Sequence, residues 1–383
     1  MRDRAEVVVI GAGFAGAATA YHLARRGVGD VVVLEREPVP GAHASGRNAA
    51  LVRRVTDPEP VRRISAAGAA ALESGELAPA ARFRRIGSLL LASGERVREL
   101  ECEAQACRAD GIDVRRLGPR EISGLVPLLS GAGHEAGFHC PSDGVVDIHS
   151  LLLAYLAGAR SGGAHVLFST PVKAIETRDG QVVAVVTGRG RIRTDRVVNA
   201  AGAWAGELAG TAGSTSVPLV PYRRHLFLTA PLAGISPDLP FVWDESNSFY
   251  FRPESGGLLL SPCDEEEHPA SPPAVDPRFQ ELLAERLLPV LPIARELRVA
   301  RAWACLRTFA PDRMPVIGPD PRVRGLFWVA GLGGHGMTAS DAIGALAAAR
   351  LMGEPGPGET AEFFLPERFG APSPPTQIQE IAS

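Results

Sequence analysis

The sequence predicts an α/β protein in which a Rossmann-like domain with a parallel sheet is interleaved with an α+β domain built on an antiparallel sheet. Three observations lead to this fold class. The chain opens with an apolar strand, a glycine-rich loop and a helix rich in small residues. A second strand and glycine loop come near the other end, and short strands typical of an antiparallel sheet lie between them. Because signals of the parallel type stand at both ends and in the middle, the two domains are expected to interleave.

The opening segment AEVVVIGAGFAGAATAYHLARRGVGDVVVLERE contains a dinucleotide-binding fingerprint in its required context. In such a motif Gly11 permits the tight turn, Gly13 lets the backbone approach a pyrophosphate, and Gly16 allows the helix to pack on the strand. The start of the helix then offers unpaired N–H groups to the phosphates. A turn without a ligand is the weaker interpretation, because strand, loop and helix are all present.

An acidic residue completes the motif. Glu35 ends the second strand, where its carboxylate is placed to accept hydrogen bonds from ribose hydroxyls. Its charge would repel the extra phosphate of NADP, so NADP is disfavoured. The motif alone does not decide between NAD and FAD, but its place so near the start of the chain is common in flavoproteins.

Composition excludes several classes of protein. The 383 residues are 45% hydrophobic with a net charge of −3, so a large core is possible and nothing indicates nucleic-acid binding. Five separated cysteines form no C-x-x-C pair, and neither a metal site nor a disulfide framework is expected. Lys173 is the only lysine, which together with the many Ala, Gly and Pro residues suggests a GC-rich bacterial genome.

The start of the chain shows no secretory leader, and no run of ~20 apolar residues could span a bilayer. A cytoplasmic protein is therefore expected, with peripheral attachment to the inner membrane as the alternative.

Periodicity along the chain predicts further elements. Helices are expected over residues 61–74, 94–110, 117–126, 151–160, 279–288 and in the small-residue segment that ends at Met352. Strands are expected over residues 85–93, 165–169, 172–177, 182–187, 192–200, 226–229, 248–252, 257–261 and 327–330. The Pro-rich residues 262–277 are expected to form a loop.

The residues that carry a family resemblance are spread over nearly the whole chain, from about Ala5 to Arg350. The segments are VVVIGAGFAGAATAYHL, VVVLEREPVPGAHASGRNAA, VVNAAGAWAGELAG, PYRRHLFLTAP, SFYFRP, RAWACLRTFAPDRMPVIG and FWVAGLGGHGMTAS. In this order they resemble the D-amino acid oxidase (DAO) family of FAD enzymes, in the branch that contains glycine oxidase, monomeric sarcosine oxidase and bacterial D-arginine dehydrogenase.

The resemblance implies FAD as cofactor and a GR2-type FAD-binding domain. That domain is expected to be discontinuous, over residues 1–84, 141–216 and 316–365. The substrate domain would occupy residues 85–140 and 217–315, and residues 366–383 would form a loosely held tail. No metal is implied. The residues expected at the cofactor are Gly11, Gly13, Phe14, Ala15, Gly16, Glu35, Arg36, Ser45, Gly46, Arg47, Asn48, Ala49, Val172, Ala201, Gly202, Trp204, Arg307, Gly333, Gly334, His335, Gly336, Met337 and Thr338.

The second glycine loop, from Gly331 to Thr338, precedes a helix. Its free N–H groups and helix dipole could face the N1–C2=O edge of the flavin, where negative charge develops on reduction.

The resemblance also implies the residues that bind substrate. Arg307 matches the arginine that holds the substrate carboxylate, for which a planar guanidinium is well suited. Arg224 and Tyr250 match further carboxylate-binding positions. His335 is the best titratable candidate for a catalytic role. For each of these the alternative is an ordinary surface or core residue.

Departures from the D-arginine dehydrogenase branch argue against a cationic substrate. That branch has His, Tyr and Glu where this chain has Leu51, Thr56 and Gly87. Cys305 matches a cysteine that joins the flavin covalently in sarcosine oxidase-like members, although a free buried cysteine is commoner.

The predicted function is oxidative deamination of an amino acid, a D-amino acid that is not strongly cationic, by hydride transfer from Cα to flavin N5. The alternatives are an N-methyl or cyclic imino acid oxidase, a non-catalytic FAD-binding subunit of a complex, and an NAD-binding module. Because Lys173 lies on the adenine side, no lysine is expected near the flavin to assist O₂ reduction. A quinone or other acceptor is therefore predicted, with O₂ as the alternative.

Overall fold

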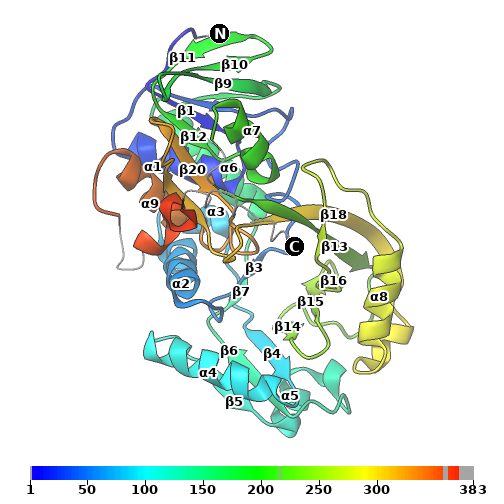
Figure 1. Ribbon diagram of the computed structural model, residues 1–383. Helices are drawn as coiled ribbons and strands as arrows, with labels where there is room; N and C mark the ends of the chain where they lie inside the picture. Colours follow the sequence, from blue (N-terminus) through cyan, green and yellow to red (C-terminus); the bar gives the residue numbers. More distant parts are fainter. Residues whose placement is uncertain (1, 215–216, 357–360, 371–383) are drawn as a thin grey trace, which may run out of the picture.

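The computed structural model describes residues 2–214, 217–356 and 361–370. Two large sheets dominate it, one at each end of an elongated molecule (Figure 1). Two long antiparallel strands, β13 (Val220–Thr229) and β18 (Val299–Phe309), run along the side of the second sheet that faces the first.

The first sheet has six strands and is parallel except at one edge. Its order is β19 (Val316–Pro319), β20 (Leu326–Ala330), β12 (Val197–Asn199), β1 (Val7–Ile10), β2 (Val31–Leu34) and β8 (His165–Leu167). Only β19 is antiparallel to its neighbour. β1, β2 and β12 are fully buried, which explains why they are continuous apolar runs rather than alternating ones.

Helices cover one face of this sheet, and a small antiparallel sheet covers the other. The covering helices are α1 (Phe14–Arg25), α6 (Ile148–Ser161) and α9 (Ser340–Leu351), joined by α2 (Glu59–Ser74). On the opposite face lie β9 (Val172–Arg178), β10 (Gln181–Thr187), β11 (Gly190–Arg193) and α7 (Ala205–Thr211). The nucleotide-type sheet is therefore buried on both sides.

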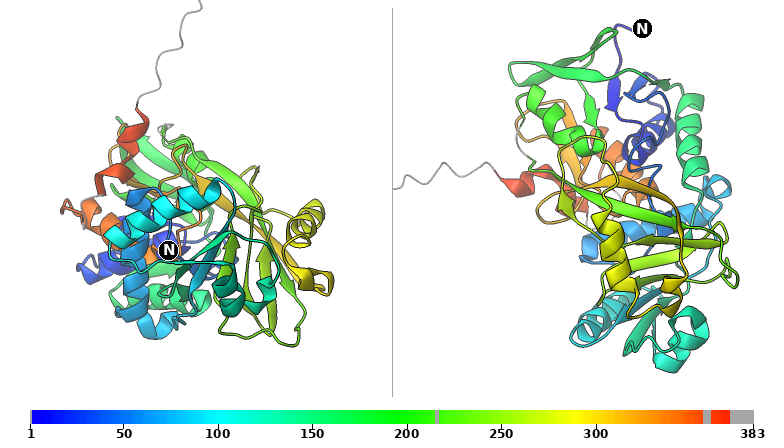
Figure 2. Two further views of the ribbon diagram at one scale, coloured as in Figure 1. Left: turned by 90° about the horizontal axis from the view of Figure 1, so that it is seen from below. Right: turned by 90° about the vertical axis from the view of Figure 1, so that its right-hand side faces the viewer.

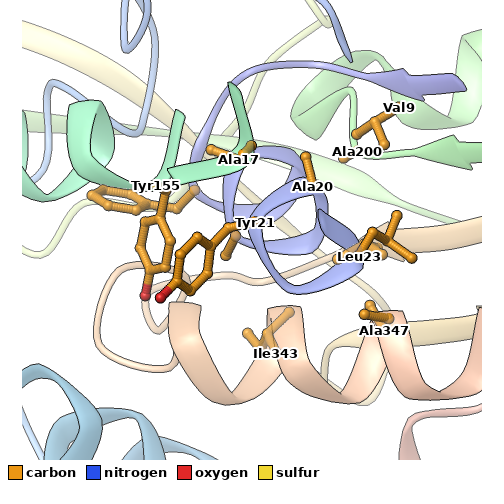
Figure 3. Close-up of a cluster of buried hydrophobic side chains, with 14 of the residues drawn as sticks. Val9, Ala17, Ala20, Tyr21, Leu23, Tyr155, Ala200, Ile343 and Ala347 are labelled. Atoms are coloured by element: carbon orange, nitrogen blue, oxygen red, sulfur yellow. The ribbon is translucent and has the colours of Figure 1, made fainter. Parts of the chain in front are cut away.

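Small residues let α1 sit deep between its neighbours. Ala17 and Ala20 of α1 lie among Tyr155 of α6 and Ile343 of α9, and Tyr21 packs edge-on against Tyr155 (Figure 3). A Cβ added to Gly344 of α9 would come within 2.6 Å of the α1 backbone. This close packing fixes the start of α1 relative to the sheet.

The second sheet has nine strands and an antiparallel majority. Its order is β17 (Glu266–Glu267), β13, β16 (Gly257–Ser261), β15 (Phe249–Glu254), β14 (Phe241–Asp244), β4 (Ser88–Ala92), β6 (Ala136–Cys140) and β5 (Arg115–Leu117), with β18 paired to β13. One face buries Phe227, Phe249 and Phe251 beside α8 (Arg278–Leu287). The other face points toward the first sheet.

Shorter elements complete the molecule. Helices α4 (Arg96–Ala109) and α5 (Pro119–Leu125) cover the far end of the second sheet (Figures 1 and 2). The remaining pieces are α3 (Ala78–Ala81), β3 (Leu51–Val52), β7 (Gly144–Val145) and the 3₁₀ turns η1 (Pro127–Leu129), η2 (Gly202–Trp204), η3 (Pro292–Arg295), η4 (Ala361–Phe364) and η5 (Pro366–Phe369). The strands of the two sheets alternate along the chain, as the interleaved fold class requires.

The structure corrects several details of the sequence prediction. The Pro-rich residues 262–277, expected to form a loop, contain the short strand β17, and strands β6, β14 and β19 were not predicted. The single strand expected over residues 192–200 is two strands, β11 and β12, separated by a turn in which the Thr194 hydroxyl donates to the Glu6 carbonyl oxygen. Strand β18 was not predicted at all. The first part of the expected loose tail is the 3₁₀ turn η5, held by Arg368, which donates to Asp312 and to the Met314 carbonyl. Residues 371–383 of that tail lie outside the described residues.

Candidate active site

A cavity of about 1120 Å³ lies where the C-terminal ends of the first sheet meet the inner face of the second. It is larger than the roughly 300–1,000 Å³ of an ordinary small-molecule pocket. Residues of both sheets and of both glycine loops line it. Its size suits a dinucleotide together with a small substrate.

The start of α1 presents unused N–H groups to this cavity. The amides of Gly13 and Ala15, which line the cavity, have no hydrogen-bond partner among the described residues. The Phe14 amide donates to the Ser45 hydroxyl at 3.0 Å. Gly13 leaves the approach open, because a Cβ there would lie 2.8 Å from the Ser45 oxygen. These groups form a site for a pyrophosphate.

Glu35 holds the turn before α1. Its carboxylate accepts from the Ala12 amide at 2.8 Å and from the Glu37 amide at 2.9 Å. Each oxygen keeps a further lone pair that a ribose hydroxyl could use. Gly11 makes the turn possible, because its φ is +103° and a Cβ there would overlap the Ala200 carbonyl.

Four side chains form a connected cluster near Glu35, at the cavity. The Arg36 guanidinium lies 3.5 Å from the centre of the Trp204 ring, and the His43 ring is 4.8 Å from Trp204. Glu37 accepts from Arg36 at 3.0 Å and contacts His43 at 2.9 Å. Arg36 and Trp204, both expected at the cofactor, are thus brought together by the fold.

The loop after Glu35 is tied to the second sheet. The Trp303 indole N–H donates to the Arg47 carbonyl oxygen at 2.9 Å, and Arg252 donates to the Ala49 carbonyl oxygen at 2.6 Å. Asn48 folds the loop on itself by donating to Ser45. Hydrogen bonds therefore join this cofactor loop (residues 45–49) to the second sheet, including β18, the strand that carries Arg307.

The second glycine loop is also open to the cavity. The amides of Gly334, Gly336, Met337 and Thr338 have no partner among the described residues. The Gly333 amide donates to the Thr308 carbonyl oxygen at 3.0 Å, which fixes the loop against β18. The helix α9 begins two residues later than the loop ends, at Ser340, so turns rather than the helix itself present these amides.

These two sets of free amides fit FAD. The amides at α1 suit a pyrophosphate, and those of the second loop suit a group that becomes negative on reduction. Both sets line one continuous cavity, which also reaches Val172 on the adenine side. The residues present therefore agree with the cofactor that the sequence predicts.

Two arginines of the second sheet face the same cavity. Arg307 is half-buried and has no ion pair or hydrogen bond with the described residues. Burial, together with the charge of Arg224, lowers the pKa of its guanidinium. Arg224 is 2% exposed and donates to Glu265 at 2.9 Å, but its Nε and Nη1 have no partner. An anionic ligand would satisfy these donors.

Tyr250 occupies a different place from the one expected. It is fully buried in β15 and does not line the cavity, because Trp243 stacks over it with ring centres 4.6 Å apart. Its hydroxyl makes no hydrogen bond with the described residues, and burial raises its pKa. The surface presented to a ligand here is the indole of Trp243.

His335 faces the cavity as a neutral imidazole. Burial and the positive charges of Arg53, Arg307 and Arg313 lower its pKa to about 3. The His335 residue is half-buried, and it lines the open cavity. At neutral pH it carries no charge.

Several residues at the site were missed by the sequence argument. Glu265 accepts from buried Arg224 at 2.9 Å and from half-exposed Arg313 at 2.8 Å. Arg53 and Glu245 pair at 3.3 Å beside Trp243. Arg53, Glu245 and Glu265 stand in no motif, so only the fold brings them to the cavity.

Most predicted site residues line this one cavity. They are Gly11, Gly13, Phe14, Ala15, Glu35, Arg36, Ser45, Arg47, Asn48, Ala49, Val172, Ala201, Gly202, Trp204, Arg224, Cys305, Arg307, Gly333, Gly334, His335, Gly336, Met337 and Thr338. Gly16, Gly46 and Tyr250 do not line it. Cβ atoms at Gly16 and Gly46 would overlap backbone carbonyls, so these glycines serve packing.

Two sequence arguments about the substrate end need correction. Leu51 and Thr56 line the cavity, but Gly87 lies outside it, beside a smaller cavity with His139, so its identity says nothing of the substrate. The argument from the missing lysine also needs correction, because arginines supply positive charge near the second glycine loop. Arg53, Arg307 and Arg313 act electrostatically on His335, which belongs to that loop.

Comparison with known proteins settles the family. Residues 6–350 match the family described as "FAD dependent oxidoreductase" (DAO). The chain belongs to this family. The match confirms the predicted family, the oxidoreductase class and FAD as cofactor.

Individual relatives indicate the range of substrates in the family. The chain is 30% identical over 395 residues to mitochondrial dimethylglycine dehydrogenase of Mus musculus, covering 96% of this chain and 44% of the relative. The chain thus spans less than half the length of the first curated relatives it matches. The solved structure of L-proline dehydrogenase from P. horikoshii has a TM-score of 0.87 at 24% identity, covering 96% and 98% of the two chains.

A further solved structure, iminodiacetate oxidase from Chelativorans sp. BNC1, has a TM-score of 0.80 at 26% identity, covering 94% and 99% of the two chains. These comparisons agree with the two-sheet fold. Separately, within residues 2–214, 217–356 and 361–370, no helix combines the length and apolar character that crossing a bilayer requires.

Proposed function

We propose that this chain oxidises the C–N bond of an amino acid whose nitrogen carries a second carbon substituent. The observation that carries the proposal is the pair Arg307 and Arg224. Both face the cavity beside the second glycine loop, and both keep guanidinium donors without partners among the described residues. A carboxylate is the ligand that fits such donors.

The arginines would fix the substrate by its carboxylate. A planar guanidinium binds two carboxylate oxygens in parallel, which orients the neighbouring carbon as well as holding it. Arg307 lies next to the second glycine loop, since a Cβ at Gly334 would be 3.5 Å from its Nη1. FAD, held by the free amides of the two glycine loops, would supply the acceptor for a hydride from the substrate carbon that Arg307 positions.

His335 would act by hydrogen bonding rather than by taking a proton. With a pKa of about 3 it is a weak base, and it stays neutral at physiological pH. A neutral imidazole can accept from, or donate to, a substrate amine. The lowered pKa also favours substrates that arrive with an unprotonated amine.

The comparisons favour an N-substituted amine over a primary D-amino acid. Dimethylglycine, proline and iminodiacetate, the compounds named for three relatives, each carry more than one carbon on nitrogen. Glu245 and Glu265, which line the cavity, are already paired with arginines, so neither of these two carboxylates is free to bind a cationic side chain. Oxidation of a D-amino acid remains the second candidate from the sequence.

An anaerobic screen tests the proposal. Purified holoenzyme is mixed with N-methyl and cyclic amino acids and with D- and L-forms of primary amino acids, while flavin absorbance is followed. We expect N-substituted amino acids to bleach the flavin fastest. Faster bleaching by primary D-amino acids would favour the second candidate, and no bleaching by any of them would favour a non-catalytic role.

The electron acceptor is tested with the same reduced enzyme. Because arginines surround His335, positive charge that assists O₂ reduction is available at this end of the cavity. Stopped-flow mixing with air-saturated buffer measures the reaction with O₂ directly. Slow reoxidation by O₂ and fast reoxidation by a quinone would identify a dehydrogenase.

A further inference from the structure

A third arginine, Arg53, lines the same cavity as Arg307 and Arg224. Arg53 follows the short strand β3, and its side chain lines the cavity with 16% exposure. Its guanidinium lies 4.7 Å from the centre of the Trp243 ring. Nε donates to the Val55 carbonyl oxygen at 2.6 Å and Nη2 to Glu245 at 3.3 Å, while Nη1 has no partner among the described residues.

The inner face of the second sheet separates the two arginines. Arg307 belongs to β18. Trp243, whose ring contacts the Arg53 guanidinium, belongs to β14. Strands β13, β16 and β15 lie between β18 and β14 in the sheet. Four strand spacings amount to roughly 19 Å at the backbone. Two long guanidinium side chains that reach inward from these ends leave room for a short molecule between them. Trp243, which stacks on Tyr250, also contacts the Arg53 guanidinium and so holds it at this end of the sheet.

The carboxylates of this half of the cavity offset only part of these charges, because each is shared between two arginines or pairs with an arginine elsewhere. Glu245 lies 3.3 Å from Arg53 and 3.4 Å from Arg96, and Glu265 lies 2.9 Å from Arg224 and 2.8 Å from Arg313. Asp57 pairs with Arg62 and Asp312 with Arg368, and Arg307 has no ion pair among the described residues. A single substrate carboxylate would balance only part of what remains.

We propose that the substrate has a second anionic group, held by Arg53, and is therefore a dicarboxylic N-substituted amino acid. The first carboxylate binds Arg307 and Arg224, and the second binds Arg53. This inference rests on the proposed function, because it takes the carboxylate site at Arg307 as given.

Ligand binding to the holoenzyme tests the second subsite without knowledge of the substrate. The probes are glutarate and pentanoate, which have the same number of carbons and differ in one carboxylate, with perturbation of flavin absorbance as the signal. We expect glutarate to bind about tenfold or more tightly than pentanoate. Arg53→Gln should remove most of that ratio.

A second variant gives the opposite sign. Glu245→Gln removes the acid that competes for Arg53, so it should raise the affinity for glutarate relative to pentanoate, an outcome that general damage would not produce. Arg301→Gln is the matched control, because Arg301 is an exposed arginine of β18 that does not line the cavity. It should leave the ratio unchanged.

The outcomes separate this inference from the proposed function. Equal binding of the two probes, or a ratio that survives Arg53→Gln, overturns the second subsite and assigns the surplus charge to the cofactor instead. Failure of both probes to perturb the flavin of the parent chain, or pentanoate binding that Arg307→Ala leaves unchanged, overturns the carboxylate site itself.

Discussion

The indole N–H of Trp303 donates to the carbonyl oxygen of Arg47 at 2.9 Å, across 256 positions of sequence. This bond joins the cofactor loop to β18, the strand that also carries Arg307. Trp303→Phe keeps an aromatic ring and removes only the donor. We expect FAD affinity to fall about fivefold, because a neutral hydrogen bond contributes about 1 kcal/mol. Fluorescence titration of the apoprotein with FAD measures this, and unchanged affinity would mean that the bond does not position the loop.

Arg307→Ala removes the unpaired guanidinium of the carboxylate site. The loss should be about 2–5 kcal/mol in kcat/KM, roughly 30-fold or more, for carboxylate-bearing substrates. FAD content should stay the same, as the flavin spectrum will show. Arg301→Ala, on the same strand and exposed, is the control and should retain full activity. Near-normal turnover by Arg307→Ala would refute the assignment.

Gly13→Ala should weaken cofactor binding. The added Cβ would lie 2.8 Å from the Ser45 oxygen, in the approach to the free amides of α1. We expect FAD affinity to fall about tenfold or more, measured by equilibrium titration. Gly29→Ala is the control, because nothing lies within 4 Å of its added Cβ. Equal losses in both variants would point to a general effect of the substitution.

The lowered pKa of His335 makes stability depend on pH. Its pKa is about 3 in the folded chain, against about 6.5 in an unfolded one. As the pH falls from 6.5 toward 3, the unfolded chain takes up a proton that the folded chain does not, so the free energy of unfolding decreases. Above pH 6.5 the effect vanishes. Urea denaturation at pH 7.5 and pH 5 should show a smaller decrease in His335→Gln than in the parent chain; an equal decrease would argue against the shift.

FAD should leave the protein when it is precipitated with acid. Cys305 lines the cavity, but burial raises the pKa of its thiol and so keeps it protonated. The measurement is flavin absorbance in the supernatant after trichloroacetic acid. Flavin that stays in the pellet of the parent chain, but not of Cys305→Ala, would instead show a covalent link.

Local motifs explain what the sequence could predict. Both glycine loops and their neighbouring strands were recognised because glycines such as Gly11, Gly13 and Gly334 are required by the local backbone conformation. Such a requirement leaves a motif that is visible in the sequence. The same is true of the buried strands β1 and β2, whose continuous apolar runs are typical of a parallel sheet.

What could not be predicted depends on contacts distant in sequence. Strand β18 was missed because its first four residues are exposed and arginines interrupt its apolar residues, so the sequence shows neither a continuous apolar run nor a regular alternation. Arg53 and Glu265 stand in unremarkable segments, and only the paired sheets bring them to the cavity. Tyr250 was placed at the ligand because nothing local reveals that Trp243 covers it.

The alternation of strands between the two sheets has a consequence for how such a chain can be modified. The first sheet takes strands from residues 7–34, 165–199 and 316–330, and the second takes them from residues 88–140 and 220–309. No single cut therefore separates the part that holds the cofactor from the part that faces the substrate. Exchange of substrate preference between relatives by recombination would require two separate blocks to move together, so new specificities in this fold are more readily reached by point substitutions such as those at Arg53.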